Sequence, residues 1–386
     1  MNCKNYRLLP AVLLILLVSS CTKDIQNVNR PENYVDGTFS DVFDAFWNGM
    51  NNNYVFWDID TTDWDAMYRR YQPVFAKLNI NDSGDVKKSI NYFRLMTQGL
   101  VDSHYNLSFE YGAVADSSIN PSYGRKMDTI HQFVFYPNYV QNYLDDGFVY
   151  GEDTETDPSE DRFAMAGTIN NNILYFYCYT FGLKSSYEAS NNNKIKKVLD
   201  YFFTKLSNPA GLKGVIIDVR GNPGGEVTDL NFLLGRMVSS PLTFGYTRYK
   251  NGNGRLDYTP WAPATITPHA GAKGLSIPVI ALADAWSVSL AELTTMAIHS
   301  MPNGKFIGEK TWGANGPLSP NQNFNGGQFT AANFLFAYTS SSEFKYLDGN
   351  IYEGKGFPPD ISVPYNEAYL NQGRDAALEA AILNIP

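Results

Sequence analysis

The chain has 386 residues and a formal net charge of −9, with 44% hydrophobic, 15% aromatic and 18% charged residues. This length is enough for a sizeable hydrophobic core and for two or three structural units. The composition excludes an intrinsically disordered chain and a fibrous repeat, because apolar residues are plentiful and the charge content is moderate. The negative charge, with no cluster of lysine and arginine, argues against nucleic acid as a partner.

The amino-terminal segment has the pattern of an export signal. A basic start precedes the apolar run from Leu8 to Val18, and small residues then lead to Cys21. The run is shorter than the roughly 20 residues that a membrane-spanning helix needs. Because the segment ends in "VSSC", it resembles a bacterial lipobox, with an ordinary signal peptide and a chance cysteine as the alternative. We expect residues 1–20 to be a lipoprotein signal peptide, and Cys21 to be lipidated and to anchor the protein to a bacterial membrane in the cell envelope.

A polar, turn-rich tether over residues 21–36 then leads into three regions of different pattern. Residues 37–104 carry apolar and aromatic side chains at helical spacing, which predicts a small helical domain. Residues 105–165 mix the strand-like stretches "HQFVFY" and "GFVYG" with turn formers, and their pattern assigns no fold. Residues 166–386 predict an α/β fold with parallel strands and crossover helices, because strand and helix patterns alternate. The expected elements are strands at "ILYFYCYTF", "GVIIDV", "PVIALA" and "KFIGE", and helices near 185–207, after Gly225 and from Ser289.

Two turns in this α/β region carry residues suited to chemistry. The segment "GVIIDVRGNPGG", residues 214–225, is a buried-type strand that ends in glycines. Glycines let backbone N–H groups point at a developing oxyanion, although a tight turn alone would also need them. The segment "WSVSLAE" places Ser289 near a helix N-terminus, where free N–H groups stabilise negative charge. The alternative is that Ser287 and Ser289 are helix caps and that Glu292 completes a capping box.

Together these segments resemble the carboxy-terminal processing peptidases (the tail-specific proteases) and the tricorn-type core proteases, which form one serine peptidase family. The matching segments, in the family's order, are "DVRGNPGG", "SVSLAE", "IGEKTWGANG" and "EGKGFPPDISV". The resemblance implies a crotonase/ClpP-like α/β catalytic core after a small N-terminal helical domain, with no metal and no organic cofactor. It also implies that Ser289 is the nucleophile, and that the oxyanion hole uses the N–H of Leu290 and one N–H from Gly224 or Gly225.

The general base requires a separate argument. The processing peptidases use a lysine within "GKG", and the matching position here, within "GANG", is Ala314. Histidine is the natural replacement because its pKa lies near neutrality. His269 lies in a proline-flanked loop, and His299 is about 15 Å along the nucleophile's own helix, so we expect neither ring to reach the Ser289 hydroxyl. His131 lies in the unassigned region, and His104 lies where the helical domain joins the rest of the chain.

His104 follows Ser103, and this pair resembles the serine–histidine pair of the tricorn branch. That branch uses a tetrad, which here would be Ser289, His104, Ser103 and Glu353. The glutamate, in "EGKGFPPD", would orient the Ser103 hydroxyl and offset the imidazolium charge. Alternatively, the Ser103–His104 pair caps a helix and Glu353 is a loop carboxylate.

The sequence therefore predicts a lipid-anchored, cell-envelope serine endopeptidase that hydrolyses peptide bonds of unfolded proteins or peptides through an acyl-enzyme. The alternative is a catalytically inactive lipoprotein on the same fold that binds a peptide or glycan with its aromatic-rich surface, since the chain has 26 Tyr, 24 Phe and 6 Trp. Many processing peptidases also hold a PDZ domain, for which residues 105–165 are short. The substrate sequence, the membrane face and the oligomeric state stay open.

Overall fold

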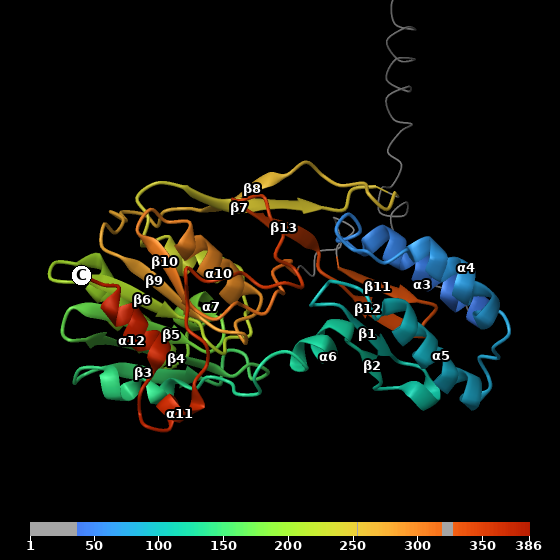
Figure 1. The fold of residues 1–386 in the computed structure, drawn as a ribbon, viewed down its shortest axis with the longest axis horizontal. Coiled ribbons are helices and arrows are strands. Elements are labelled where there is room, and N and C mark those ends of the chain that lie inside the picture. The colour runs from blue at the N-terminus through green and yellow to red at the C-terminus, as the bar shows by residue number, and fades with distance from the viewer. Residues whose placement is uncertain (1–36, 253, 319–326) are drawn as a thin grey trace, which may run out of the picture.

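The computed structural model describes residues 37–252, 254–318 and 327–386, so Cys21 and the expected tether lie outside the described residues. The chain forms an α/β lobe, which contains the C-terminus, and a helical lobe, with a long β-arm reaching from one to the other (Figure 1). In the described ranges no helix combines the length and the apolar character needed to cross a bilayer.

The α/β lobe is built on a seven-stranded sheet with the order β14-β10-β9-β6-β5-β4-β3. Five neighbouring strands pair in parallel, and β4 and β3 are antiparallel to the strand beside each of them. The parallel strands are β5 (Ile173–Cys178), β6 (Gly214–Asp218), β9 (Val279–Ala283), β10 (Gly304–Gly308) and β14 (Ile361–Ser362), and the others are β4 (Arg162–Ile169) and β3 (Val149–Asp153). β6 and β9 are buried at every residue, which explains their continuous apolar sequences.

Both faces of this sheet are covered, so alternate residues of one strand belong to different cores. Ile217 packs in the core on the side of α8, α9 and α10, whereas Ile216 packs on the opposite side against α12 and residues 133–144. The bounds are α7 (Leu183–Glu188), α8 (Ile195–Ser207), α9 (Thr228–Leu234), α10 (Leu290–His299), α11 (Glu367–Leu370) and α12 (Ala376–Leu383). The predicted α/β architecture is confirmed, with the helix expected near 185–207 present as the pair α7 and α8.

The helical lobe contains three helices packed on a four-stranded antiparallel sheet with the order β11-β12-β1-β2. Its elements are α3 (Phe39–Asn53), α4 (Trp64–Phe75), α5 (Ser83–Thr97), β1 (Asn106–Phe109), β2 (Ser118–Ile119), β11 (Gln328–Ala331) and β12 (Leu335–Tyr338). Its core is aromatic, with the Phe334 ring packed against Phe39 and Phe93. Two strands from the last quarter of the chain thus complete the lobe that the N-terminal helices begin.

The arm joins the two lobes. It is a three-stranded sheet of β7 (Leu242–Tyr249), β8 (Ala262–Ile266) and β13 (Ser342–Tyr346), with β7 in the middle. At its far end Arg255 donates to the Asn51 side chain at 2.7 Å, and the Tyr258 hydroxyl donates to the Val55 carbonyl at 2.8 Å. These contacts hold the helical lobe against the arm.

The region that the sequence left unassigned contributes to both lobes. It supplies β1 and β2, then α6 (Pro121–Met127) between the lobes, then β3 and the start of β4 (Figure 1). Three single-turn 3-10 helices, η1 (Gly112–Val114), η2 (Pro137–Tyr139) and η3 (Gln141–Tyr143), connect these elements. The prediction of a strand at "HQFVFY" is wrong, because residues 131–136 form no strand and their Phe135 packs instead on one face of the large sheet.

Candidate active site

The site is framed by three loops that follow β6, β9 and β10, which are neighbours in the sheet. Because these strands are parallel, their carboxyl ends lie at one edge, where α/β proteins commonly place their functional residues. The loops span residues 219–225, 284–289 and 309–316. Two of them carry the glycine turn and the serine pair singled out from the sequence.

Ser289 stands at the start of α10 with a strained backbone. Its φ of 56° and ψ of −116° lie where residues other than glycine rarely occur, at a cost of order 1–3 kcal/mol. Ser289 and Glu292 do form a capping-box arrangement, in which the Ser289 N–H donates to the Glu292 carboxylate at 3.2 Å. A capping residue normally has an extended backbone, however, so capping does not explain this conformation.

The neighbouring Ser287 has a structural role. It is fully buried, and its hydroxyl donates to the Val219 carbonyl at 2.7 Å and accepts the Asp284 N–H at 2.9 Å. These bonds tie the serine loop to the loop that follows β6. Of the two serines, Ser289 is therefore the one whose backbone geometry calls for another explanation.

The glycine turn packs directly against Ser289. A Cβ atom on Gly224 would lie 2.7 Å from the Ser289 Cβ and 3.1 Å from the Leu290 nitrogen, so only glycine fits there. The Gly224 N–H donates to the Asn222 side-chain oxygen at 2.7 Å. Among the described residues, the N–H groups of Gly225 and Leu290 have no hydrogen-bond partner. Of the two glycines, Gly225 is the one that retains a free donor.

Glu292 organises the loop after β10. Its carboxylate is fully buried and accepts hydrogen bonds from the Thr311 hydroxyl at 2.6 Å, the Gly313 N–H at 2.8 Å and the Ala314 N–H at 2.6 Å. Burial raises the pKa of Glu292, against the effect of these donors. Ala314, at the position of the family's lysine, thus contributes only its backbone to this network, and the nearby Lys310 is exposed.

The loop that carries His104 is tied to the same network. The Ser103 hydroxyl donates to the Gly313 carbonyl at 2.7 Å, and the Ser103 N–H donates to Glu353 at 2.7 Å. Since the Gly313 N–H donates to Glu292, Gly313 joins the helix of Ser289 to the loop of His104 through two hydrogen bonds. The structure thus ties Ser103 and Glu353 to each other and to the Gly313 loop, with the Ser103 hydroxyl on a carbonyl and the Ser103 N–H on Glu353. Among the described residues, His104 makes its hydrogen bonds to Asp102 and Ser340 and makes none to Ser289.

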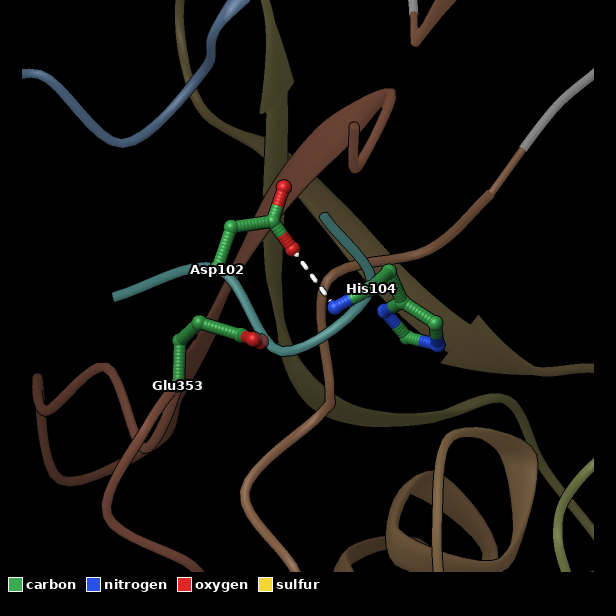
Figure 2. A group of neighbouring side chains, drawn as sticks. All are labelled: Asp102, His104 and Glu353. Atoms are coloured by element: carbon green, nitrogen blue, oxygen red, sulfur yellow. Dashed lines mark hydrogen bonds between the residues drawn. The ribbon is translucent and has the colours of Figure 1, made fainter. Parts of the chain in front are cut away.

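Two buried carboxylates flank His104. Figure 2 shows Asp102 and Glu353 pointing at the short loop that bears His104, whose backbone N–H donates to Asp102 at 2.9 Å. One nitrogen of His104 and one oxygen of each carboxylate lie within 4.8 Å of one another. Such a set could ligate a metal, but each of the four oxygens already accepts a hydrogen bond from Ser103, His104, Gly316 or Ser340, so we assign no ion here.

The hydroxyl beside the His104 ring is that of Ser340, which follows β12. Its oxygen lies 3.4 Å from His104 Nδ1 and donates to Asp102 at 2.9 Å. Burial lowers the pKa of His104 to about 4 and raises that of Asp102 to about 6. The pKa of Glu353 is also raised, first by burial and then by the charge of Asp102. No motif in the sequence singled out Asp102 or Ser340, because their proximity depends on the pairing of β1 with β12.

The other three histidines have different surroundings. His131 pairs with Glu309 at 2.7 Å, and although burial lowers its pKa, this carboxylate outweighs burial and raises it. His299, at the end of α10, contacts the Tyr346 hydroxyl at 2.6 Å and Asp360 at 3.1 Å. His269 is exposed in its loop.

A lysine that the sequence did not suggest lies close to this site. α6 places the Lys126 ammonium 5.9 Å from the centre of the Trp312 ring. Burial lowers the pKa of Lys126, and the charge of Lys310 lowers it further, while Glu292 and Glu353 raise it. Lys126 is therefore an alternative to His104 as the group that takes the proton of Ser289, and a Lys126 variant tests this alternative.

Comparison with known proteins connects this geometry to one family. Residues 174–363 match the model of peptidase family S41, and residues 37–82 match that of the tricorn protease C1 domain. Over 185 residues the chain is 25% identical to the tricorn protease of Thermoplasma volcanium, which covers 48% of this chain and 16% of that protein. Over 162 residues it is 26% identical to the carboxy-terminal processing protease CtpA of Bacillus subtilis, which covers 41% of this chain and 32% of that protein. The aligned region is thus less than a third of the length of either relative.

The fold extends over nearly the whole chain in one solved structure. A putative peptidase from Parabacteroides merdae superposes with a TM-score of 0.69 at 23% sequence identity. The match covers 91% of this chain and 97% of that protein. The two-lobed arrangement described above is therefore shared with a known fold.

Proposed function

We propose that the chain is a serine endopeptidase of peptidase family S41, whose model matches residues 174–363, and that it cleaves unfolded proteins or peptides with Ser289 as the nucleophile. The observation that carries this proposal is the strained backbone of Ser289 at the start of α10, where the glycine turn packs against it through Gly224. Strain of this kind persists only where the surrounding structure enforces it, and it is common at reactive residues. A helix cap or a binding surface would not need it.

In the proposed reaction, the Ser289 Oγ attacks the carbonyl carbon of the scissile peptide bond while His104 Nε2 takes the hydroxyl proton. The N–H groups of Leu290 and Gly225 hold the resulting oxyanion. The tetrahedral intermediate then breaks its C–N bond, and the proton on His104 passes to the leaving amine. Water, deprotonated by His104, attacks the acyl-enzyme in the second half, and Ser289 recovers its proton.

A fluorophosphonate probe tests this proposal against the alternative of an inactive binding protein. We expect the probe to label wild-type protein at Ser289, because phosphonylation needs the activated hydroxyl and oxyanion donors that hydrolysis needs. Peptide mapping by mass spectrometry identifies the labelled residue, and Ser287→Ala and Ser289→Ala serve as matched variants. Label retained in Ser287→Ala and lost in Ser289→Ala supports the enzyme, whereas unlabelled wild-type protein with a native circular dichroism spectrum favours the binder.

The proposed location is the bacterial cell envelope, with the lipidated Cys21 as the membrane anchor on either the periplasmic or the surface face. The support is the "LVSSC" sequence that ends the apolar run. We expect Cys21→Ala to move the protein from the membrane fraction to the soluble fraction, because the lipid on Cys21 is the proposed attachment to the membrane. A variant that stays fully membrane-bound would contradict lipid anchoring.

A further inference from the structure

A contact chain runs from the half-buried His104 ring through a buried hydroxyl to a buried carboxylate, and it differs from the serine–glutamate arrangement that the family resemblance implied. The Ser340 hydroxyl lies between His104 Nδ1, at 3.4 Å, and Asp102 Oδ1, at 2.9 Å. Ser340 and Asp102 are both fully buried. The hydroxyl of Ser103 donates to the Gly313 carbonyl instead, so it is not the hydroxyl that faces the ring.

The direction of these hydrogen bonds follows from the number of hydrogen atoms and acceptors around the Ser340 hydroxyl. The Ser340 hydroxyl has one hydrogen and three acceptors nearby, namely Asp102 at 2.9 Å, the Gly316 carbonyl at 3.3 Å and His104 Nδ1 at 3.4 Å. A carboxylate is the strongest of these acceptors, and it is also the closest. The hydrogen therefore points to Asp102, and the oxygen of Ser340 is left to accept a hydrogen bond from Nδ1–H of the ring.

Asp102 is held in place for this role by backbone groups. Its Oδ2 accepts the Ser340 N–H at 2.7 Å, and its Oδ1 accepts the His104 N–H at 2.9 Å as well as the Ser340 hydroxyl. The same carboxylate thus fixes both the loop that carries the imidazole and the hydroxyl that contacts it. Since each oxygen has a defined donor, the carboxylate cannot turn away without losing several hydrogen bonds.

We propose that Asp102 and Ser340 are positioning residues that place the proton of neutral His104 on Nδ1, so that Nε2 is free to accept the proton of Ser289. Only the role of Nε2 as the acceptor of the Ser289 proton rests on the proposed function. The tautomer itself is a property of the folded protein. Glu353, whose two oxygens accept the N–H groups of Ser103 and Gly316, holds the loops together in this scheme without orienting the ring.

Nuclear magnetic resonance of protein labelled with ¹⁵N-histidine tests the proposal without any measurement of activity. Long-range ¹H–¹⁵N correlations near pH 7 show which ring nitrogen carries the proton, and a His104→Gln variant assigns the signals. We expect the Nδ1–H form in wild-type protein. In Ser340→Ala we expect a shift toward the Nε2–H form that prevails in free histidine, because the acceptor for Nδ1–H is gone.

Matched variants separate this role from general packing. Ser122→Ala removes another buried hydroxyl, which donates to the Ser103 carbonyl at 3.2 Å, and it should leave the tautomer unchanged. Glu353→Gln should also leave it unchanged. Asp102→Asn should reproduce the Ser340→Ala shift, and it provides the answer if Ser340→Ala does not fold. If His104 carries its proton on Nε2 in wild-type protein, or keeps Nδ1–H in both variants, the proposal is overturned.

Activity provides an independent readout. We expect Ser340→Ala to lower kcat about 100-fold with little change in KM, because general base catalysis contributes roughly 10²- to 10⁴-fold and the wrong tautomer removes most of it. An unchanged kcat in a variant whose tautomer has shifted would overturn the mechanistic part of the proposal. A wild-type protein with the Nδ1–H form but no peptidase activity would instead refute the proposed function and leave the tautomer assignment standing.

Discussion

Ser289→Ala should abolish peptide hydrolysis, and His104→Ala should abolish it about as fully. In an activated-serine constellation the nucleophile and its base act as a unit, so the double variant should be no slower than either single variant. Each loss should be on the order of 10⁴-fold or more in kcat. The measurement is kcat/KM on an unstructured peptide, with folding checked by circular dichroism.

Two lysine variants are the controls for the identity of the base. Lys310 is exposed, and Lys126 packs over Trp312, so Lys310→Ala and Lys126→Ala should keep most of the wild-type activity. Lys126 is the more informative control of the two. Burial lowers its pKa, which favours the neutral amine that a general base needs, while Glu292 and Glu353 raise the pKa. Loss of activity in Lys126→Ala together with retention in His104→Ala would show that a lysine, and not His104, takes the serine's proton.

The pH dependence gives the same assignment a distinct signature. A general base works in its neutral form, and burial lowers the pKa of His104 to about 4, well below the 6.5 of an unperturbed histidine. The acid limb of kcat/KM should therefore lie near pH 4, and activity should be nearly constant from about pH 5 to 7. A profile that falls already below pH 7 through an apparent pKa of about 6.5 would show that His104 is solvated or paired with a charge in the working enzyme.

The sequence predicted the parts of the fold whose signal is local. β6 and β9 are buried on both faces, so their apolar runs were visible without knowledge of their partners. The sheet of the helical lobe was missed because it pairs Asn106–Phe109 with Leu335–Tyr338, more than 200 residues away in the sequence. Residues 131–136 have a strand-like pattern because aromatic residues are common in strands. In the structure Phe135 of this stretch packs on a face of the large sheet, and this packing depends on residues distant in the sequence.

The candidate site divides in the same way. Ser289 and the glycine turn lie in motifs with fixed spacing, so resemblance could place them. Glu292 could be interpreted from the sequence only as a cap, whereas the structure shows its carboxylate holding the loop of Gly313 and Ala314. The hydroxyl facing His104 belongs to Ser340 because β12 ends beside the His104 loop, and no spacing in the sequence contains that information.

Removal of a single backbone N–H at Leu290 or Gly225 should lower kcat about 100- to 1000-fold with little change in KM. These two donors have no hydrogen-bond partner among the described residues, and a donor that holds the oxyanion contributes mainly in the transition state. An amide-to-ester exchange at either position, with leucic acid or glycolic acid introduced by nonsense suppression, removes the N–H and leaves the side chain intact. Valine would be a poorer probe at the glycine turn, because a Cβ on Gly225 would lie 1.9 Å from the Phe181 carbonyl oxygen.

Ala291 and Gly224 provide the matched ester controls for this experiment. The Ala291 N–H donates to the Val288 carbonyl at 3.0 Å, and the Gly224 N–H donates to Asn222, so neither is available to a substrate. An ester at Ala291 should cost only the stability of one hydrogen bond, about 1 kcal/mol, and leave kcat nearly unchanged. An ester at Gly224 should lower kcat less than one at Gly225, because its effect passes through the position of the turn. Equal kcat values for the esters at Leu290, Gly225 and Ala291 would show that neither the Leu290 N–H nor the Gly225 N–H belongs to the oxyanion hole. A donor to the oxyanion should lower kcat when it is lost, and the Ala291 N–H should not.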